Sequence, residues 1–386
     1  MGNALAVIEW LTGDECHEAD DAGLVAGLGR RLRAIGLPVD RMVLYLRTLH
    51  PEIFGRSIAW SPGEPVEIHD RDHGIQTAAA LAGSPLPRVM ATRETAVLRL
   101  DGADRPAWTT MDIFRGRNLV EYVFVALSNA DGPVSAASFS TARRGGFRPE
   151  EREMLARIVP ALRNACELRT LRRVELTLLD TYIGATTARR ILAGRIRRGE
   201  VESLPAALML CDLRGFTAMS NALPSARVLE LLNTYFDLVL PAIAAAGGEV
   251  VKFMGDAVLA FFHRDDPAAA CAAALQGARD ALTRLDGFSA DDAVLRTGIA
   301  LHYGDVAYGN IGSGHRLDFT VIGPDVNLVS RIQGLCGPSG EALLMSERFA
   351  GLIGRAQTRP VGRHEMRGFA EAMPLHALAR ISQTAL

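Results

Sequence analysis

The sequence predicts an α+β protein: a mixed N-terminal domain, a connecting helix, and a C-terminal α/β sandwich with a largely antiparallel sheet. Three observations lead to this fold class. The chain has 386 residues, which is long for one compact domain. Segments with the apolar period of helices and segments with the period of strands occur in both halves. Near residue 203 the pattern changes, and buried strands begin to alternate with long amphipathic helices.

Residues 1–165 are expected to form a small sensor module. Residues 21–36 have the spacing of an amphipathic helix that ends at a glycine, and residues 39–50 alternate as a strand does. Further strands are expected at 94–100, 117–132 and 134–147, bounded by Gly, Asn and Asp. A closing helix begins near residue 148.

Residues 166–202 are expected to connect the two domains as a helix and transducer. Leucines recur every seven residues in two stretches that are offset from one another, at Leu155, Leu162, Leu171 and Leu178. Such a spacing suits a parallel dimer helix, and a helix packed on its own domain is the alternative. A second helical segment, 186–204, leads into the C-terminal domain.

Residues 203–386 are expected to form the sandwich. A buried strand begins near 204, and residues 225–248 follow as a long amphipathic helix closed by glycines. Residues 248–262 read as two strands around a tight turn at Met254 and Gly255. A helix at 266–285, a strand at 294–312 and a helix at 325–336 complete the alternation.

Composition excludes several classes of protein. With 48% hydrophobic and 22% charged residues the chain is typical of globular proteins, and its net charge of −2 does not fit a general nucleic-acid binder. Five cysteines without a close pair resemble neither a disulfide framework nor a zinc site. The N-terminus does not read as a signal peptide, and no apolar run has the length of a membrane span. We therefore expect a cytoplasmic protein without a membrane or nucleic-acid partner.

Two aspartates are the first candidates for chemistry. Asp212 ends a predicted buried strand, and Asp256 lies in the strand-turn-strand segment that would bring it beside that end. Two carboxylates held at adjacent strand ends can bind a divalent ion with oxygen ligands, most naturally Mg²⁺ or Mn²⁺. Two aspartates at turns are more commonly structural caps, so this pair does not identify a site by itself.

Four segments occur in a fixed order: LCDLRGFTAMS, VVKFMGDAVLAFF, RTGIALHYGDVAYGNIG and RLDFTVIGPDVNLVSRI. Together they resemble the catalytic domain of class III nucleotidyl cyclases, the family of adenylate and guanylate cyclases, over roughly residues 203 to 380. Residues 138–167 resemble the end of a GAF-type domain, in which a last strand turns into a long helix. The resemblance implies an N-terminal GAF-like regulatory domain, which would bind a small-molecule ligand.

The resemblance also assigns roles to individual residues. Asp212 and Asp256 match the two metal-binding aspartates, which implies two Mg²⁺ or Mn²⁺ per active site. Phe216 and Thr217 match the loop after the first strand, whose backbone amides would contact the triphosphate. Asn327 and Arg331 match the pair that would position the ribose and stabilise the α-phosphate in the transition state. Arg296 and Arg367 match positions that would bind the terminal phosphates. Arginine suits such contacts because its planar fork keeps its charge.

Lys252 is the only lysine among 42 basic residues. It matches a lysine that adenylate cyclases direct at the purine ring, and the partner position, seven residues before Asn327, is Thr320. An ammonium and a hydroxyl complement the N1 acceptor and 6-amino donor of adenine. Many family members have Asp at that position, whereas Thr is typical of a bacterial subgroup. Asp318 is two residues earlier, so the count from Asn327 does not select it.

The favoured interpretation is an adenylate cyclase that converts ATP to 3′,5′-cyclic AMP and pyrophosphate. Because one chain carries both halves of the family's site, the resemblance implies a homodimer with active sites at its interface, regulated by the N-terminal domain. Two alternatives remain open: a cyclase for GTP or a pyrimidine triphosphate, and a non-catalytic ligand-sensing protein with a cyclase fold.

Overall fold

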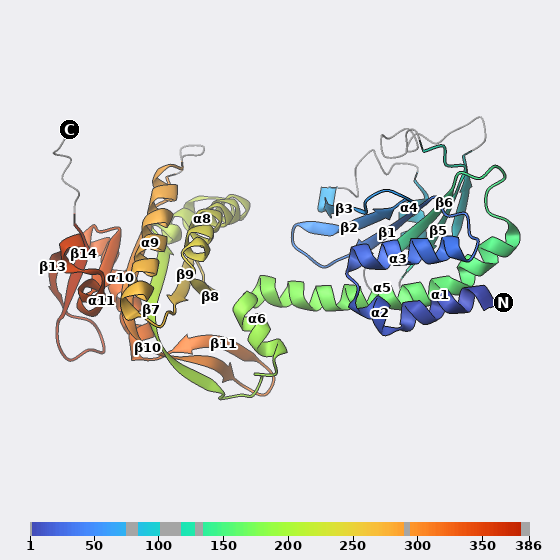
Figure 1. Ribbon diagram of the computed structural model, residues 1–386. Coiled ribbons are helices and arrows are strands. Elements are labelled where there is room, and N and C mark those ends of the chain that lie inside the picture. Colours follow the sequence, from blue (N-terminus) through green and yellow to red (C-terminus); the bar gives the residue numbers. More distant parts are fainter. Residues whose placement is uncertain (1, 75–83, 101–116, 128–133, 289–293, 380–386) are drawn as a thin grey trace. The chain divides into compact units, whose positions relative to one another are not determined.

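The computed structural model describes residues 2–74, 84–100, 117–127, 134–288 and 294–379. These divide into two compact units, residues 1–181 and 182–386, each with its own sheet and core (Figure 1). Each unit combines helices with a sheet that is rich in antiparallel strand pairs, which confirms the predicted combination of helices and strands. The GAF-like identity of the first unit remains a prediction. The last seven residues of the predicted catalytic domain, 380–386, lie outside the described part.

The N-terminal unit has a six-stranded sheet in the order β3-β2-β1-β6-β5-β4. The strands are β1 (Arg41–Arg47), β2 (Ile53–Trp60), β3 (Glu67–Asp72), β4 (Ala96–Arg99), β5 (Glu121–Ala126) and β6 (Ala136–Thr141). The helices are α1 (Gly2–Thr12), α2 (Asp14–Glu18), α3 (Asp21–Ala34), α4 (Pro85–Thr92) and the first part of α5 (Pro149–Ile183). One face of the sheet packs on α1, α3 and α5, and α4 covers part of the other (Figure 1).

Helix α5 runs from Pro149 to Ile183, so it joins the expected closing helix to the first part of the predicted connecting segment 166–202 and ends well before residue 202. Leu155 and Leu162 are buried in the core of the N-terminal unit, whereas Leu171 is 60% exposed. The first half of the leucine series therefore packs on its own domain, and only the second half is available to a partner. The expected second helical segment is also shorter than predicted: α6 (Ala185–Leu192) ends well before β7 begins at Val201.

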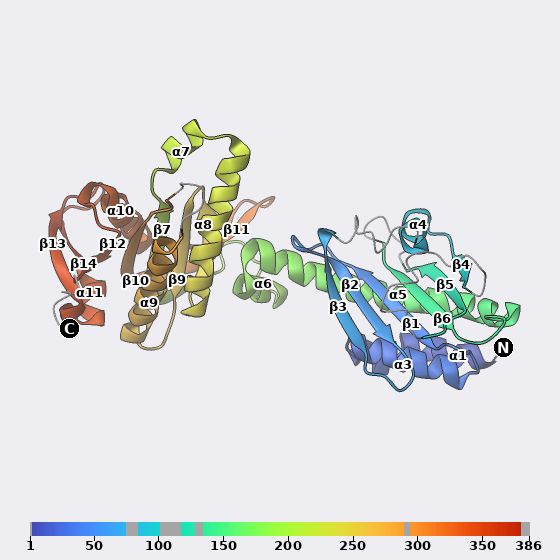
Figure 2. The ribbon, with the colours of Figure 1, turned by 90° about the horizontal axis from the view of Figure 1, so that it is seen from above.

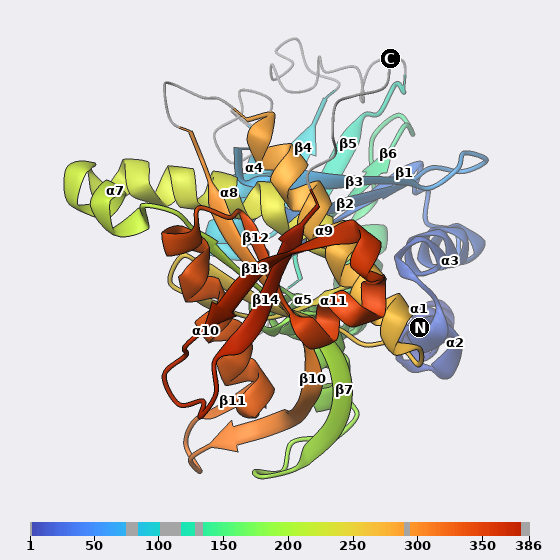
Figure 3. The same ribbon diagram turned by 90° about the vertical axis from the view of Figure 1, so that its left-hand side faces the viewer.

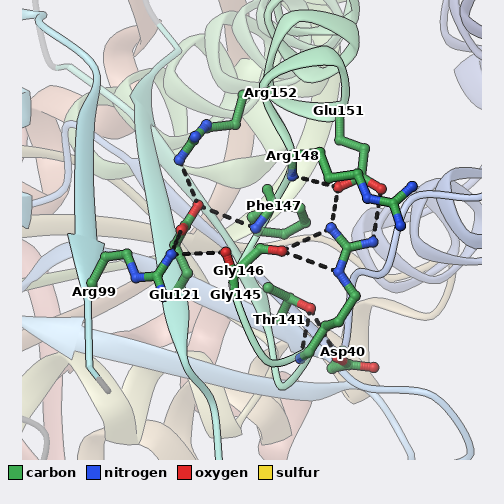
Figure 4. Close-up of polar contacts among 11 residues, drawn as sticks. Asp40, Arg99, Glu121, Thr141, Gly145, Gly146, Phe147, Arg148, Glu151 and Arg152 are labelled. Carbon is green, nitrogen blue, oxygen red and sulfur yellow. Dashed lines mark hydrogen bonds and ion pairs between the residues drawn. The ribbon is translucent and has the colours of Figure 1, made fainter. Parts of the chain in front are cut away.

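A polar cluster fixes the start of α5 on the sheet (Figure 4). Glu121 of β5 is fully buried and forms ion pairs with Arg152 of α5 at 3.1 Å and with Arg99 of β4 at 3.5 Å. One residue earlier on the helix, Glu151 pairs with Arg143. Gly146 has φ +74°, and a Cβ there would lie 2.1 Å from a Glu121 carboxylate oxygen, so the loop can approach the carboxylate only as glycine.

The C-terminal unit has an eight-stranded sheet in the order β13-β14-β12-β10-β7-β9-β8, with β11 paired to β10. Among the described residues of this sheet, all strand pairs are antiparallel except β10 with β12. The strands are β7 (Val201–Leu213), β8 (Glu249–Met254), β9 (Ala257–Phe262), β10 (Thr297–Gly312), β11 (Leu317–Ile322), β12 (Leu343–Ser346), β13 (Thr358–His364) and β14 (Met373–Leu378). Besides α6, the α-helices of this unit are α7 (Phe216–Ala222), α8 (Ser225–Ala245), α9 (Pro267–Asp286), α10 (Pro324–Ser339) and α11 (Glu347–Ile353).

The two faces of this sheet have different coverings. Helices α8 and α9 pack on one face (Figure 2), and α10 packs on the other. Strand β11 pairs with the second half of β10 (Figure 3), so it is displaced from the main ladder. Among the described helices α8 is long and apolar enough to cross a membrane, but residues such as Tyr235 and Val239 bury one of its faces in this core.

Candidate active site

Asp212 and Asp256 come together because of the register of β7, β8 and β9. Asp212 is the next-to-last residue of β7 and pairs with Ala257, the first residue of β9. Asp256 directly precedes Ala257, in the tight turn where Gly255 has φ +68°. The predicted turn is present but lies one residue later than expected, at Gly255 and Asp256, because Met254 still pairs with Ala257 as the last residue of β8. The two carboxyl groups are within hydrogen-bonding reach of each other.

The proximity of the two carboxyl groups is electrostatically unfavourable. Burial, and then the hydrogen bond and charge of Asp256, raise the pKa of Asp212 to about 7. A hydrogen bond from Gln333 on α10 acts in the opposite direction. Two carboxylates that repel each other at a partly buried strand end are a donor set that fits a divalent cation with oxygen ligands.

A buried hydrogen-bond chain supports the backbone at Asp212. The Thr297 hydroxyl donates to the Asp212 carbonyl at 3.0 Å, and the Tyr235 hydroxyl lies 2.9 Å from that of Thr297 and donates to it. Tyr235 is fully buried on α8. The chain joins a helix and two strands, and nothing in the spacing of the sequence indicates it.

The segment after β7 begins at Gly215, whose φ of +78° allows the sharp change of direction into α7. Phe216 and Thr217 start this helix, with Phe216 partly buried and Thr217 exposed. Arg296 is exposed just before β10, and its carbonyl accepts from the Arg214 backbone N–H at 2.8 Å. Thus Phe216, Thr217 and Arg296 lie at the same end of the sheet as the aspartate pair.

The base-reading candidates lie on β8 and β11. Lys252 forms an ion pair with Asp318, with 3.2 Å between Nζ and Oδ2. Thr320, two residues further along β11, is 4% exposed, and its hydroxyl has no hydrogen-bond partner within the part of the chain that the structure describes. The Lys252–Asp318 contact is a feature that counting from Asn327 did not reveal.

Asn327 and Arg331 are exposed on α10, one turn apart on the same face. A buried relay holds the start of this helix: Asp325 accepts from the Asp305 backbone N–H at 2.7 Å and contacts His302 at 3.0 Å. The other ring nitrogen of His302 lies 2.7 Å from the Ser346 hydroxyl. His302 thus has the structural role of joining α10 to β10 and β12.

Arg367 is exposed in the segment between β13 and β14. Within the described residues no hydrogen bond or ion pair joins the aspartate pair to Lys252, Asn327 or Arg331. The candidate residues in one chain therefore form separate groups on the C-terminal unit: the metal end, the β8–β11 pair, the exposed face of α10, and Arg367.

Comparison with known proteins gives a consistent result for the C-terminal unit. Residues 201–379 match the family model described as the adenylate and guanylate cyclase catalytic domain. An adenylate cyclase of Anabaena cylindrica is 37% identical over 150 residues, which cover 36% of this chain and 29% of that protein. Adenylate cyclase 1 of Rhizobium meliloti (strain 1021) is 29% identical over 182 residues, which cover 45% of this chain and 27% of that protein.

A solved structure of a bacterial light-regulated adenylyl cyclase is 29% identical and has a TM-score of 0.41, covering 46% of this chain and 91% of that chain. The chain spans less than a third of the length of the adenylate cyclases of Anabaena cylindrica and Rhizobium meliloti. The residues that match the family model, 201–379, all belong to the C-terminal unit.

Proposed function

We propose that this protein is an adenylate cyclase, starting from the premise that its residues 201–379 are an adenylate and guanylate cyclase catalytic domain. The reaction would convert ATP to 3′,5′-cyclic AMP and pyrophosphate by attack of the ribose 3′-oxygen on the α-phosphate. The observation that carries the proposal is the adjacent pair of carboxyl groups on Asp212 and Asp256, at the end of β7 and the turn before β9.

The aspartate pair would hold two Mg²⁺ or Mn²⁺ ions. When bound, such ions lower the pKa of the attacking hydroxyl and neutralise charge on the triphosphate. The raised pKa of Asp212 supports this assignment, because a bound cation would offset both the burial and the neighbouring Asp256 carboxyl group that disfavour its ionised form. The Thr297–Tyr235 chain would keep the Asp212 backbone in place during turnover.

The remaining residues would bind and orient the nucleotide. Lys252 would donate to N1 of adenine, which is an acceptor, and Thr320 would contact the 6-amino edge. Asn327 would position the ribose, and Arg331 would stabilise the charge that develops at the α-phosphate. The terminal phosphates would be bound by Arg296 and Arg367, and by backbone amides at Phe216 and Thr217.

The active unit would be a cytoplasmic homodimer with two equivalent sites at its interface. In support, large apolar side chains are exposed near the predicted base-reading strands, with Phe253 50%, Met254 42% and Ile322 47% exposed. Exposed apolar groups of this size commonly mark an interface. The N-terminal unit, on binding a small molecule, would regulate turnover through α5.

The test is to incubate purified protein with ATP, GTP, CTP or UTP in the presence of Mn²⁺ and to identify the products. Cyclic AMP as the main product is expected, and Asp256→Ala should abolish turnover while the dimer stays intact. No cyclic product from any triphosphate would reject the proposal. Regulation is tested separately: residues 200–386 alone should differ from the full chain in rate, and an unchanged rate and ligand response would reject a regulatory role of the first unit.

A further inference from the structure

One side chain of α10, that of Gln333, reaches the metal end of its own chain. Asp212 lies on the face of the sheet that α10 covers, because Leu210 belongs to the core under α10 whereas Cys211 belongs to the core under α8 and α9. Gln333 is partly buried and donates a hydrogen bond to the Asp212 carboxyl group. The proposed function assigns no role to this contact.

The packing of α10 on β10 brings Gln333 to this place. Gly298 of β10 pairs with Asp212 in the sheet, so the two residues share the face that α10 covers. A Cβ at Gly298 would lie 2.9 Å from the Cys336 Cβ and 3.4 Å from Gln333 Nε2. Because the first distance is too short for two carbon atoms, the helix can approach the strand this closely only over a glycine. The close packing therefore holds the Gln333 amide over the strand pair at Asp212.

A second side chain ties the same strand end to the same helix. Arg214 follows Asp212 by two residues, and its Nη2 donates to the Cys336 carbonyl in the last turn of α10 at 2.7 Å and to the Glu341 carbonyl beyond it. Carbonyl groups in the last turn of a helix have no partner within the helix, so this arginine satisfies one of them. The end of β7 and the C-terminal half of α10 are thus joined at two points, by Gln333 and by Arg214.

An amide beside Asp212 suits the chemistry of the metal end. A carboxylate oxygen that accepts from the Gln333 amide still has lone pairs for a cation, and the second oxygen is left for the same purpose. The amide has no charge, so it adds nothing to the repulsion between the carboxyl groups of Asp212 and Asp256. A hydrogen bond to a ligating carboxylate fixes its orientation and contributes to metal affinity.

We propose that Gln333 is a positioning residue of the metal end, and that its amide orients the Asp212 carboxylate for a divalent cation. The inference rests on the proposed function for the identity of the site. It goes beyond that function because it gives α10 a role in the site to which its own chain contributes the aspartates. In the proposed dimer, Asn327 and Arg331 of the same helix would serve the other site, so one helix would contact both.

The first test measures Mn²⁺ binding to the full chain by electron paramagnetic resonance, with Mn²⁺ alone and with 3′-deoxy-ATP, which cannot cyclise. Gln333→Met removes the amide and keeps the length of the side chain, and Gln333→Asn, whose amide is too short, serves if Gln333→Met does not fold. The matched control is Gln276→Met, an exposed glutamine on α9 that donates to Asp280 at 2.8 Å. Thermal unfolding of each variant in EDTA checks that folding is preserved.

The Gln333 variant should raise the dissociation constant of Mn²⁺ about tenfold or more, and Gln276→Met should leave it unchanged. Unchanged Mn²⁺ binding in the Gln333 variant would overturn the inference. An unmodified protein that binds no Mn²⁺ under either condition would overturn it as well.

The second test asks which chain of the dimer needs Gln333, a readout that a purely structural role would not move. A mixed dimer of one Asp256→Ala chain and one Arg331→Ala chain, isolated by two affinity tags, would have one working site with the aspartate pair of the Arg331→Ala chain. Gln333→Met in that chain should raise the Mn²⁺ concentration for half-maximal rate about tenfold, whereas in the Asp256→Ala chain it should change it less than about twofold. Equal shifts from both placements would overturn the inference.

Failure of the proposed function is distinguishable from failure of this inference. If the unmodified protein cyclises no triphosphate, the proposed function fails, and Mn²⁺ binding alone decides on Gln333. Weaker Mn²⁺ binding in Gln333→Met would then support the inference, and equal binding would reject it.

Discussion

The repulsion between Asp212 and Asp256 has a measurable cost in the metal-free protein. Burial and the neighbouring carboxyl group raise the pKa of Asp212 to about 7 from 3.8. The folded protein therefore binds this proton more tightly than the unfolded chain does, so stability falls as the pH rises from about 4 through 7. Asp212→Asn removes the charge, and we expect the metal-free variant to be more stable than the unmodified protein at pH 8.

The magnitude follows from the difference in proton affinity. If the whole pKa difference between the folded and unfolded states contributed, it would correspond to ~4 kcal/mol of unfolding free energy. Because the carboxyl group is only partly buried, solvent screening reduces this to ~1–2 kcal/mol. For a unit of this size the expected rise in Tm is about 3–6 °C at pH 8, and a smaller rise at pH 5, where Asp212 is already largely protonated.

The assay is scanning calorimetry of the full chain in EDTA at both pH values. All three tryptophans, at positions 10, 60 and 108, belong to residues 1–181, so tryptophan fluorescence reports the N-terminal unit and identifies the other transition by difference. Asp237→Asn, an exposed acid on α8, is the matched control and should shift nothing. Mg²⁺ should stabilise the unmodified protein more than Asp212→Asn. The gain in stability of Asp212→Asn over the unmodified protein should be larger at pH 8 than at pH 5, and an equal or smaller gain at pH 8 would refute the prediction.

Three further predictions concern other contacts. Asp325→Asn should lower the free energy of unfolding by about 1 kcal/mol near neutral pH. This loss should shrink on acidification, because the His302 contact lowers the pKa of Asp325 and the stability it provides disappears as the pH falls through that pKa. Thermal unfolding of both proteins between pH 3 and 7 measures the loss, and a loss that does not change with pH would contradict the prediction. Thr297→Val breaks the chain to Asp212 and should raise the Mg²⁺ concentration for half-maximal rate about 3- to 10-fold with a smaller effect on the KM for ATP; equal effects on both would argue against a role at the metal end. Glu121→Gln should destabilise the N-terminal unit by about 2–4 kcal/mol, measured by tryptophan fluorescence in urea, because it leaves Arg152 without its ion-pair partner; a loss below about 0.5 kcal/mol would contradict this.

Local features of the structure could be predicted from the sequence where one residue type fixes the geometry. Gly255 is in the tight turn expected from the strand-turn-strand pattern, and the helix expected at 325–336 is α10. The alternation of apolar residues also placed Asp212 at a strand end, which with the turn brings it beside Asp256.

Features that depend on contacts distant in the sequence could not be predicted in this way. Thr297 supports Asp212 from a strand 85 positions away, and Asp318 meets Lys252 across 66 positions. The leucine spacing did not reveal that Leu155 and Leu162 are buried in the N-terminal unit, since the period of a helix says which residues share a face and not what that face contacts.

The most direct test of the central claim is complementation between two inactive variants. Asp256→Ala removes a metal ligand, and Arg331→Ala removes the group that would stabilise the transition state; if each site combines these residues from two chains, a mixed dimer has one intact site. After unfolding and refolding an equimolar mixture, cyclic AMP formation should return to about a quarter of the rate of the unmodified protein, because about half of the dimers are mixed and each has one of two sites. Mixed dimers that form, as verified by two affinity tags, but produce no cyclic AMP would contradict the account.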